Sequence, residues 1–197
     1  MNRACFSRTV CRIAQILHLT ALSIWLGSVA MSGVVAAIVF PLMRKLEPTL
    51  ASYPDYEGDH AMLAGGRLAS SVFFAVDTIQ FVCASLALAT LVIMIVTGYT
   101  INTIPRLLRI MVLCATLALL SYHLFIFMPQ QMLSLRGYWD FAEAGDTNQA
   151  DIFKDKFLAS HSAASRLLGT LTIAVLINII LAGWTLTAAP KEMQTND

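Results

Sequence analysis

Charged residues are scarce in this chain. Only 13% of its 197 residues are charged and 57% are hydrophobic, whereas soluble domains carry about 25% charged residues. Thirteen Lys and Arg against twelve Asp and Glu leave a formal charge of +1, so no strong field attracts nucleic acid. The composition therefore argues against a soluble globular domain, a disordered segment and a nucleic-acid-binding protein.

The chain also lacks the motifs of common cofactor and catalytic sites. Its four cysteines form no Cys-x-x-Cys pair and no zinc-type spacing, and no covalent haem-attachment motif is present. Its ten glycines include no Gly-x-Gly-x-x-Gly or Walker pattern, so no phosphate-binding loop is indicated. No convincing serine, histidine and acid arrangement is visible either, and the sequence favours a non-enzymatic role.

Four long stretches without charge are present instead, and each exceeds the roughly 17–20 apolar residues of a membrane-spanning helix. Pro41 and Pro129 are predicted to end the first and third helices, since proline follows a last turn well. The predicted helices lie near 13–40, 68–99, 107–128 and 160–187. The whole chain, 1–197, is thus predicted to be one all-α domain, an integral membrane four-helix bundle.

The first uncharged stretch follows a basic tail, which is also typical of a secretory signal peptide. It is longer than the roughly 7–15 apolar residues of such a signal, and it stops at Arg44 and Lys45. We therefore expect a first helix that is retained. Its cleavage would leave three spans and reverse the C-terminus.

Basic residues concentrate in the N-terminal tail and in the short second connection, which contains Arg106 and Arg109. The long connections, 41–67 and 129–159, carry most of the acidic residues. Because Lys and Arg density marks the cytoplasmic side, both termini are predicted to be cytoplasmic and the long connections to form an outer polar cap. We expect a multi-pass protein of a cell membrane, specifically a bacterial inner membrane. The expected partners are the lipid bilayer and either another membrane protein or a second copy of the chain.

Polar residues inside the predicted helices are the functional candidates, because such groups are costly in hydrocarbon. At about 1.5 Å per residue, Asp77, His123 and His161 fall at similar outer levels, and His60 can reach them from its connection. Three imidazoles and a carboxylate suit zinc or copper(II) and can relay protons. The alternatives are a hydrogen-bonded structural cluster and no cluster at all. The other intramembrane polar candidates are His18, Trp25, Gln80 and Asn178.

His18 precedes Trp25 by seven residues, so both lie on one face of the first helix, two turns apart. We expect His18 to bond to a facing helix and Trp25 to point into the bundle. At a rise of about 1.5 Å per residue, His18 lies too near the cytoplasmic end of its helix to bind one haem together with another histidine.

The run LHLTALSIWLGSVAMSGVVAAIVFPLM, with His18, Trp25, Gly27 and Phe40, resembles the first helix of a small membrane family of unknown function. That family includes an animal transmembrane protein implicated in platinum-drug resistance. The segment FLASHSAAS is similar to the family's entry into its last helix, although Leu168 stands where the family often has asparagine. The resemblance implies a four-helix fold and membrane residence, and no agreed reaction.

The first-helix histidine and tryptophan are also similar to those of copper-resistance D-type and haem-binding four-helix membrane proteins. This second resemblance implies an alternative, a redox protein with a histidine-ligated haem b or copper. The leading prediction is a non-enzymatic membrane protein that is a subunit of a complex or handles a small solute or metal.

Overall fold

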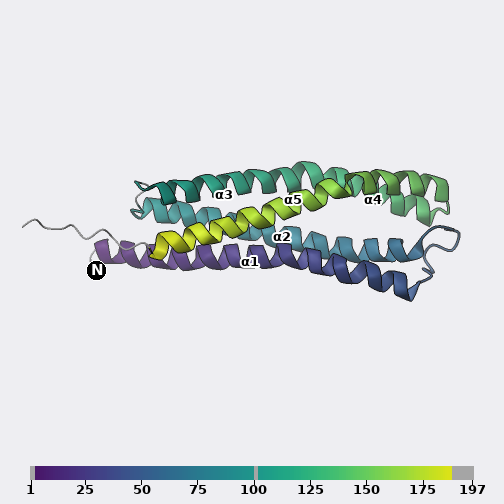
Figure 1. The fold of residues 1–197 in the computed structure, drawn as a ribbon, viewed down its shortest axis with the longest axis horizontal. Helices are drawn as coiled ribbons and strands as arrows, with labels where there is room; N and C mark the ends of the chain where they lie inside the picture. The colour runs from purple at the N-terminus through teal and green to yellow at the C-terminus, as the bar shows by residue number, and fades with distance from the viewer. Residues whose placement is uncertain (1–2, 100–101, 188–197) are drawn as a thin grey trace, which may run out of the picture.

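The computed structural model describes residues 3–99 and 102–187, which form long helices lying side by side (Figure 1). The elements are α1 (Arg3–Leu46), α2 (His60–Val96), α3 (Ile104–Tyr122), the π-helical turn η1 (His123–Phe127), α4 (Met128–Glu143) and α5 (Thr147–Thr187). Because α3, η1 and α4 form one rod, the described residues make four helices long and apolar enough to cross a membrane. The predicted all-helical, four-helix membrane architecture is confirmed at this level.

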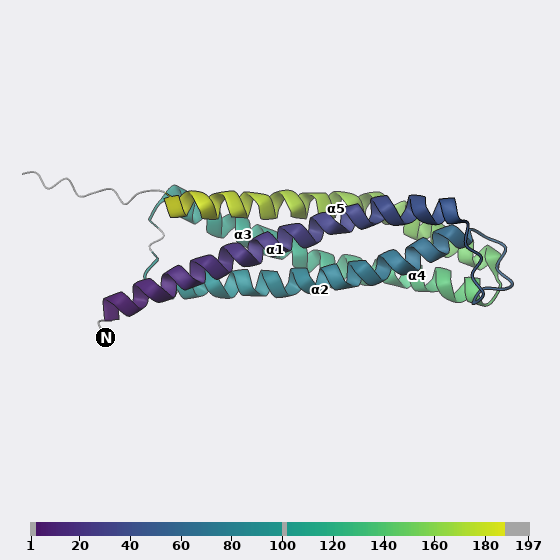
Figure 2. The same ribbon diagram turned by 90° about the horizontal axis from the view of Figure 1, so that it is seen from below.

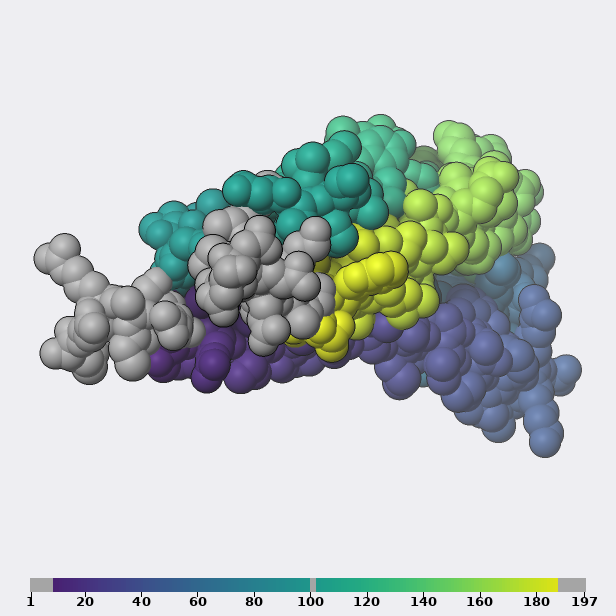
Figure 3. All heavy atoms as spheres, turned by 60° about the vertical axis from the view of Figure 1, so that its left-hand side comes forward, coloured from purple at the N-terminus to yellow at the C-terminus, as the bar shows by residue number. Residues whose placement is uncertain are grey.

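The helices pack as two pairs. α1 lies along α2, and the α3–η1–α4 rod lies along α5, whereas α2 and α3 make little contact with each other. α5 runs obliquely from α4 toward α1 (Figure 1) and contacts it, so α5 joins the two pairs. Figure 2 shows that the start of α1 and the end of α5 lie apart. Seen from the end where α1 begins and α5 finishes, α1, α5 and α3 follow one another around the bundle (Figure 3).

The helices extend well beyond the predicted ends. Pro41 lies inside α1, which continues to Leu46 and ends where Glu47 takes a left-handed φ of 46° just before Pro48. The connections 41–67 and 129–159 are predicted as loops, but only 47–59 and 144–146 lie outside helices in those regions. Gaps between charges mark the apolar part of a helix, and a helix continues through charged residues wherever water surrounds it.

Pro129 also fails to end its helix, because a π-turn precedes it. The Met128 N–H bonds to the carbonyl of His123, five residues back, so the ladder widens immediately before the proline. In a regular α-helix the proline ring would clash with the carbonyl of Phe125. The wider turn relieves this clash, and α4 continues to Glu143.

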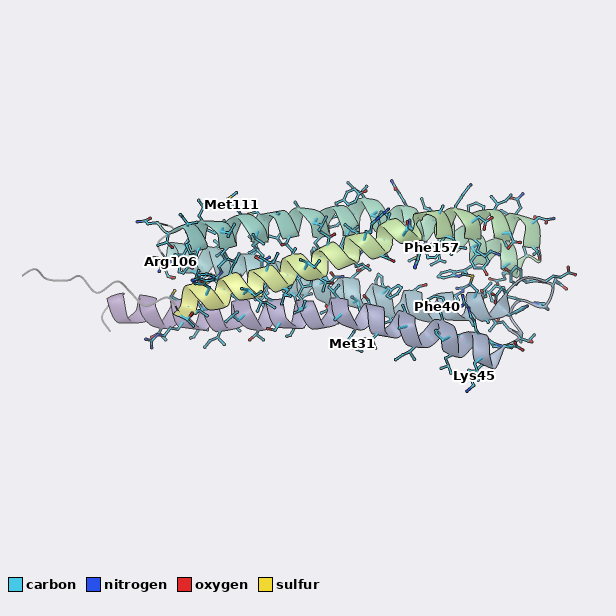
Figure 4. The ribbon with its side chains drawn as sticks, in the orientation of Figure 1. Met31, Phe40, Lys45, Arg106, Met111 and Phe157 are labelled. Atoms are coloured by element: carbon cyan, nitrogen blue, oxygen red, sulfur yellow. The ribbon has the colours of Figure 1, made fainter. Side chains whose placement is uncertain are left out.

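Two regions differ in their exposed surface. We call residues 41–70 and 128–163 the head, and residues 9–40, 71–99, 102–127 and 164–187 the membrane half. The exposed surface of the membrane half is dominated by large apolar side chains, among them Met31 and Met111, which point outward from opposite sides (Figure 4). The head exposes charged residues, namely Arg44, Lys45, Glu47, Asp55, Glu57, Asp59, Arg67, Arg136, Asp140, Glu143, Asp146, Asp155 and Lys156. The bilayer therefore fits around the membrane half, with the head beyond it.

The head has an aromatic core of its own. Tyr56 and Tyr138 share a hydrogen bond of 3.2 Å between their hydroxyls, which joins the first connection to α4. The Arg67 guanidinium lies 4.3 Å from the Trp139 ring centroid and donates to the Tyr53 hydroxyl over 3.0 Å. These contacts hold α2 and the first connection against α4.

Candidate functional site

A hydrogen-bonded imidazole and carboxylate lie inside the membrane half. His123 Nε2 donates to Asp77 Oδ1 over 3.1 Å, which joins η1 directly to α2. The side chain of His123 is 3% exposed and that of Asp77 is 15% exposed. Because α2 and α3 make little other contact, this pair is a polar bridge between the two helix pairs.

Two further side chains extend the bridge to α1. Gln80 Nε2 donates to the same Asp77 oxygen over 3.0 Å, and Gln80 Oε1 accepts from Trp25 Nε1 over 3.1 Å. Gln80 and Trp25 are fully buried. Both ends of the amide are therefore engaged, which fixes the rotamer of Gln80 and the position of the carboxylate.

The π-turn places His123 at this position. The ring of Phe127 stacks on the imidazole, with centroids 6.3 Å apart and an interplanar angle of 23°. π-turns are rare and occur frequently at functional sites, where they redirect a side chain. Here the turn coincides with the one histidine of the described chain that binds a carboxylate.

The pair retains unused hydrogen-bonding capacity. His123 Nδ1 is buried and has no partner among the described residues. Both hydrogen bonds to Asp77 use Oδ1, which leaves Oδ2 without a donor in the described part of the chain. With Nε2 carrying the proton, the neutral imidazole offers Nδ1 as an acceptor. The site thus presents acceptor atoms and a carboxylate, a combination that suits a cation or a hydrogen-bond donor.

His18 bonds to the facing helix, as the sequence suggests. Its Nδ1 donates to the Ala87 carbonyl over 2.9 Å and lies 3.0 Å from the Thr90 hydroxyl on α2. The ring is buried, and Nε2 has no partner among the described residues. The contacts of His18 are those of a residue that sets the register of α1 against α2.

The α3–α5 contact carries two similar polar links. Asn178 Nδ2 donates to the Thr116 hydroxyl over 2.9 Å, and Arg109 Nη1 donates to the Thr185 hydroxyl over 3.2 Å. Arg109 is 1% exposed, although its position in a short basic connection indicates only the cytoplasmic side. Arg109 and Thr116 lie seven residues apart, as do Asn178 and Thr185. This two-turn spacing, which His18 and Trp25 share, is the signal from which the buried arginine could be recognised.

The other two members of the predicted cluster lie elsewhere. His60 starts α2, seventeen residues and about 26 Å from Asp77 along one helix, and it bonds to the backbone of Leu50 and Tyr56. His161 is exposed on α5 and contacts the ring of Phe157. Among the described residues, no three His, Cys, Asp or Glu side chains could hold a metal ion. Asp77 and His123 lie together as expected, but the predicted cluster of four residues is not formed.

The residues present do not fit a haem held by two histidines. His18 bonds to Ala87 of α2, whereas His123 bonds to Asp77, ten residues earlier in the same helix. The two buried imidazoles therefore differ in level by about 15 Å, too far apart to bind one iron. Among the described residues, no set of three His, Cys, Asp or Glu side chains that could hold copper is assembled around either ring. Comparison with family models, with curated proteins and with solved structures finds no match to this chain.

Proposed function

We propose that this chain is a non-enzymatic multi-pass membrane protein that handles a small cationic solute at the Asp77–His123 pair. The observation that carries the proposal is an ionisable pair, hydrogen-bonded and largely buried, that bridges the two helix pairs where α2 and α3 otherwise make little contact. Ionisable residues within a membrane span are costly, and they commonly mark the path of an ion or a proton. A bridge at this position also couples occupancy of the site to the packing of the two pairs.

The local chemistry supports a cation over an anion. The pair presents a carboxylate whose Oδ2 has no donor among the described residues, and a buried imidazole acceptor atom. No arginine or lysine of the described residues forms an ion pair with Asp77. A monovalent cation or an ammonium group meets these acceptors without additional charge compensation.

Thermal unfolding of the purified protein tests the proposal. The probes are sodium, potassium, ammonium, methylammonium, guanidinium, copper(II) and zinc(II), each at millimolar concentration. A solute that binds only the folded state raises the melting temperature. We expect at least one cation to stabilise the wild type by several degrees and to have no such effect on Asp77→Asn.

The matched control is Asp140→Asn, which removes the same charge from an exposed position in the head. It should respond to the cations as the wild type does. If no cation in the panel separates the wild type from Asp77→Asn, the proposed function is contradicted. A response to copper(II) or zinc(II) alone would make the solute a metal ion.

The orientation and compartment belong to the same proposal. We propose a bacterial inner membrane, cytoplasmic termini and a head on the outer side, supported by the basic residues of the second connection. Reporter fusions at both termini and within residues 144–146 test this arrangement. A cytoplasmic signal from the 144–146 insertion would overturn it.

A further inference from the structure

A groove opens between α2 and α3 on the membrane face, beside the Asp77–His123 pair. Its volume is about 190 Å³. The residues that line it are Phe81, Ala84, Ser85 and Leu88 on one wall and Leu117, Leu120, Ser121, Leu124 and Phe125 on the other. The hydroxyls of Ser85 and Ser121 donate to carbonyls of their own helices, each over 2.8 Å. The walls therefore offer an apolar surface.

The groove leads toward the carboxylate. Asp77 is four residues from Phe81, so it is the next residue on the same face of α2. On the opposite side, His123 lies in the chain between the wall residues Ser121 and Leu124, next to the groove rather than in its lining. Asp77 is the more exposed member of the pair, and its Oδ2 has no donor among the described residues.

The depth of Asp77 suits the polar end of an amphiphile. Within the membrane half, the large exposed apolar residues of α2 run from Phe74 to Val96, about 33 Å along the helix, which is close to the hydrocarbon thickness of about 30 Å. Asp77 lies three residues inside the head end of this band. The groove extends from Asp77 toward the middle of the bilayer, so a tail would lie in hydrocarbon and a polar group at the interface.

We propose that this groove binds a single-chain amphiphilic amine, with the alkyl tail between α2 and α3 and the ammonium group on Asp77 Oδ2. The inference rests on the proposed function and names its substrate class. An ammonium donor and a carboxylate form a charge-assisted hydrogen bond, which is strengthened where little water is present.

The alternatives fit less well. Drug-sized pockets measure about 300–1,000 Å³, so a groove of about 190 Å³ holds one chain rather than the two of a phospholipid. A phospholipid would also bring its phosphate close to the Asp77 carboxylate. A helix from a second copy would cover the apolar walls but would leave Oδ2 without a donor.

Photolabelling locates the ligand directly. The probe is a twelve-carbon primary amine with a diazirine at the end of its tail, and the comparison probe is the alcohol with the same tail. Both are added to the protein in phosphatidylcholine nanodiscs, and labelled peptides are identified by mass spectrometry. We expect saturable labelling of residues 81–88 and 117–125 by the amine, at least tenfold more than by the alcohol, and competition by decylammonium.

Two variants distinguish binding of the alkyl tail from binding of the ammonium group. Asp77→Asn should reduce amine labelling to the level of the alcohol. Ser121→Phe should fill the groove and abolish labelling by both probes, while it leaves the response to small cations unchanged. The matched control is Ser23→Phe on the exposed face of α1, which should label as the wild type does.

Equal labelling by amine and alcohol, or full amine labelling of Ser121→Phe, would overturn the proposal. Competition by phosphatidylethanolamine nanodiscs would make a lipid the occupant and would overturn it as well. A disulfide-linked dimer of the Ser121→Cys variant would also overturn the proposal, because a second copy of the chain would then cover the groove. In each of these cases a cation response that depends on Asp77 would leave the proposed function standing.

Discussion

The head and the membrane half are both helical, but different interactions fill their interiors. The head buries a cluster rich in aromatic rings around Tyr56, Tyr138 and Trp139. The membrane half buries small and aliphatic residues, and it places hydrogen bonds between helices at repeated intervals. Nine polar or charged residues are buried in the described chain, and all of them lie in the membrane half.

The solvent explains this difference. Water surrounds the head, so burying aromatic area there stabilises the fold through the hydrophobic effect. Lipid tails are as apolar as leucine, so burial alone does not favour one helix neighbour over another inside the bilayer. Close packing and polar contacts such as His18 with Ala87 and Asn178 with Thr116 specify the register instead. The comparison predicts large effects from packing changes in the head and smaller effects from single polar changes in the membrane half.

The largest effect is expected from Trp139→Ala. Removing this buried ring from the head should lower the free energy of unfolding by about 3–5 kcal/mol, because a large cavity remains. Chemical denaturation in one defined detergent, followed by circular dichroism, measures the change. Trp184→Ala is the matched control, since that ring is 62% exposed on the lipid-facing surface. Equal losses in the two variants would show that the aromatic core does not dominate the stability of the head.

Overpacking tests the same core. A Cβ on Gly137 would lie 2.4 Å from the ring of Phe153, so Gly137→Ala should cost about 1–3 kcal/mol. The control is Gly66→Ala, also in the head, where no atom lies within 4 Å of the added Cβ. Denaturant midpoints of both variants check the difference. A neutral Gly137→Ala would mean that Phe153 moves aside freely.

In the membrane half, Gln80→Leu should cost about 1–2 kcal/mol. The substitution removes one of the two donors to Asp77 and leaves the Trp25 indole N–H without its acceptor. Ser32→Ala is the control, because that buried hydroxyl donates only within its own helix. Thermal unfolding of both variants in the same lipid mixture compares them. If Gln80→Leu lost as much stability as Trp139→Ala, the predicted difference between the head and the membrane half would be contradicted.

The smallest effect is expected from Thr116→Val, about 0.6 kcal/mol. Asn178 Nδ2 loses one acceptor but still donates to the Ala174 carbonyl over 2.9 Å, so this donor group keeps a partner. Thr170→Val, at an exposed position of α5 where the hydroxyl bonds to its own helix, serves as the reference. Unfolding curves recorded in parallel should separate the two variants only slightly. A difference above about 2 kcal/mol in the free energy of unfolding would show that this hydrogen bond also stabilises the fold substantially, beyond setting the register of the two helices.

Charge scarcity predicts the membrane half well, and it predicts the head poorly. The uncharged stretches locate four spans, because charge is excluded from hydrocarbon whatever the tertiary structure. The helical extensions beyond Pro41 and Pro129 depend on the surrounding packing and on a π-turn, which have no local sequence signature. Asp77 and His123 are identifiable as candidates from their depth. The links from Trp25 to Gln80 and from Arg109 to Thr185 depend on how helices cross, which a single sequence does not specify.

The distance between α2 and α3 tests the central claim, that the Asp77–His123 pair is a solute-responsive bridge. Spin labels at Ser85→Cys and Ser121→Cys, one on each wall of the groove, report this distance by pulsed electron paramagnetic resonance after the native cysteines are replaced. In nanodiscs we predict one narrow distance distribution that shifts on addition of methylammonium, and a broader distribution without that shift in Asp77→Asn. Identical distributions in the two proteins, with and without methylammonium, would contradict the account.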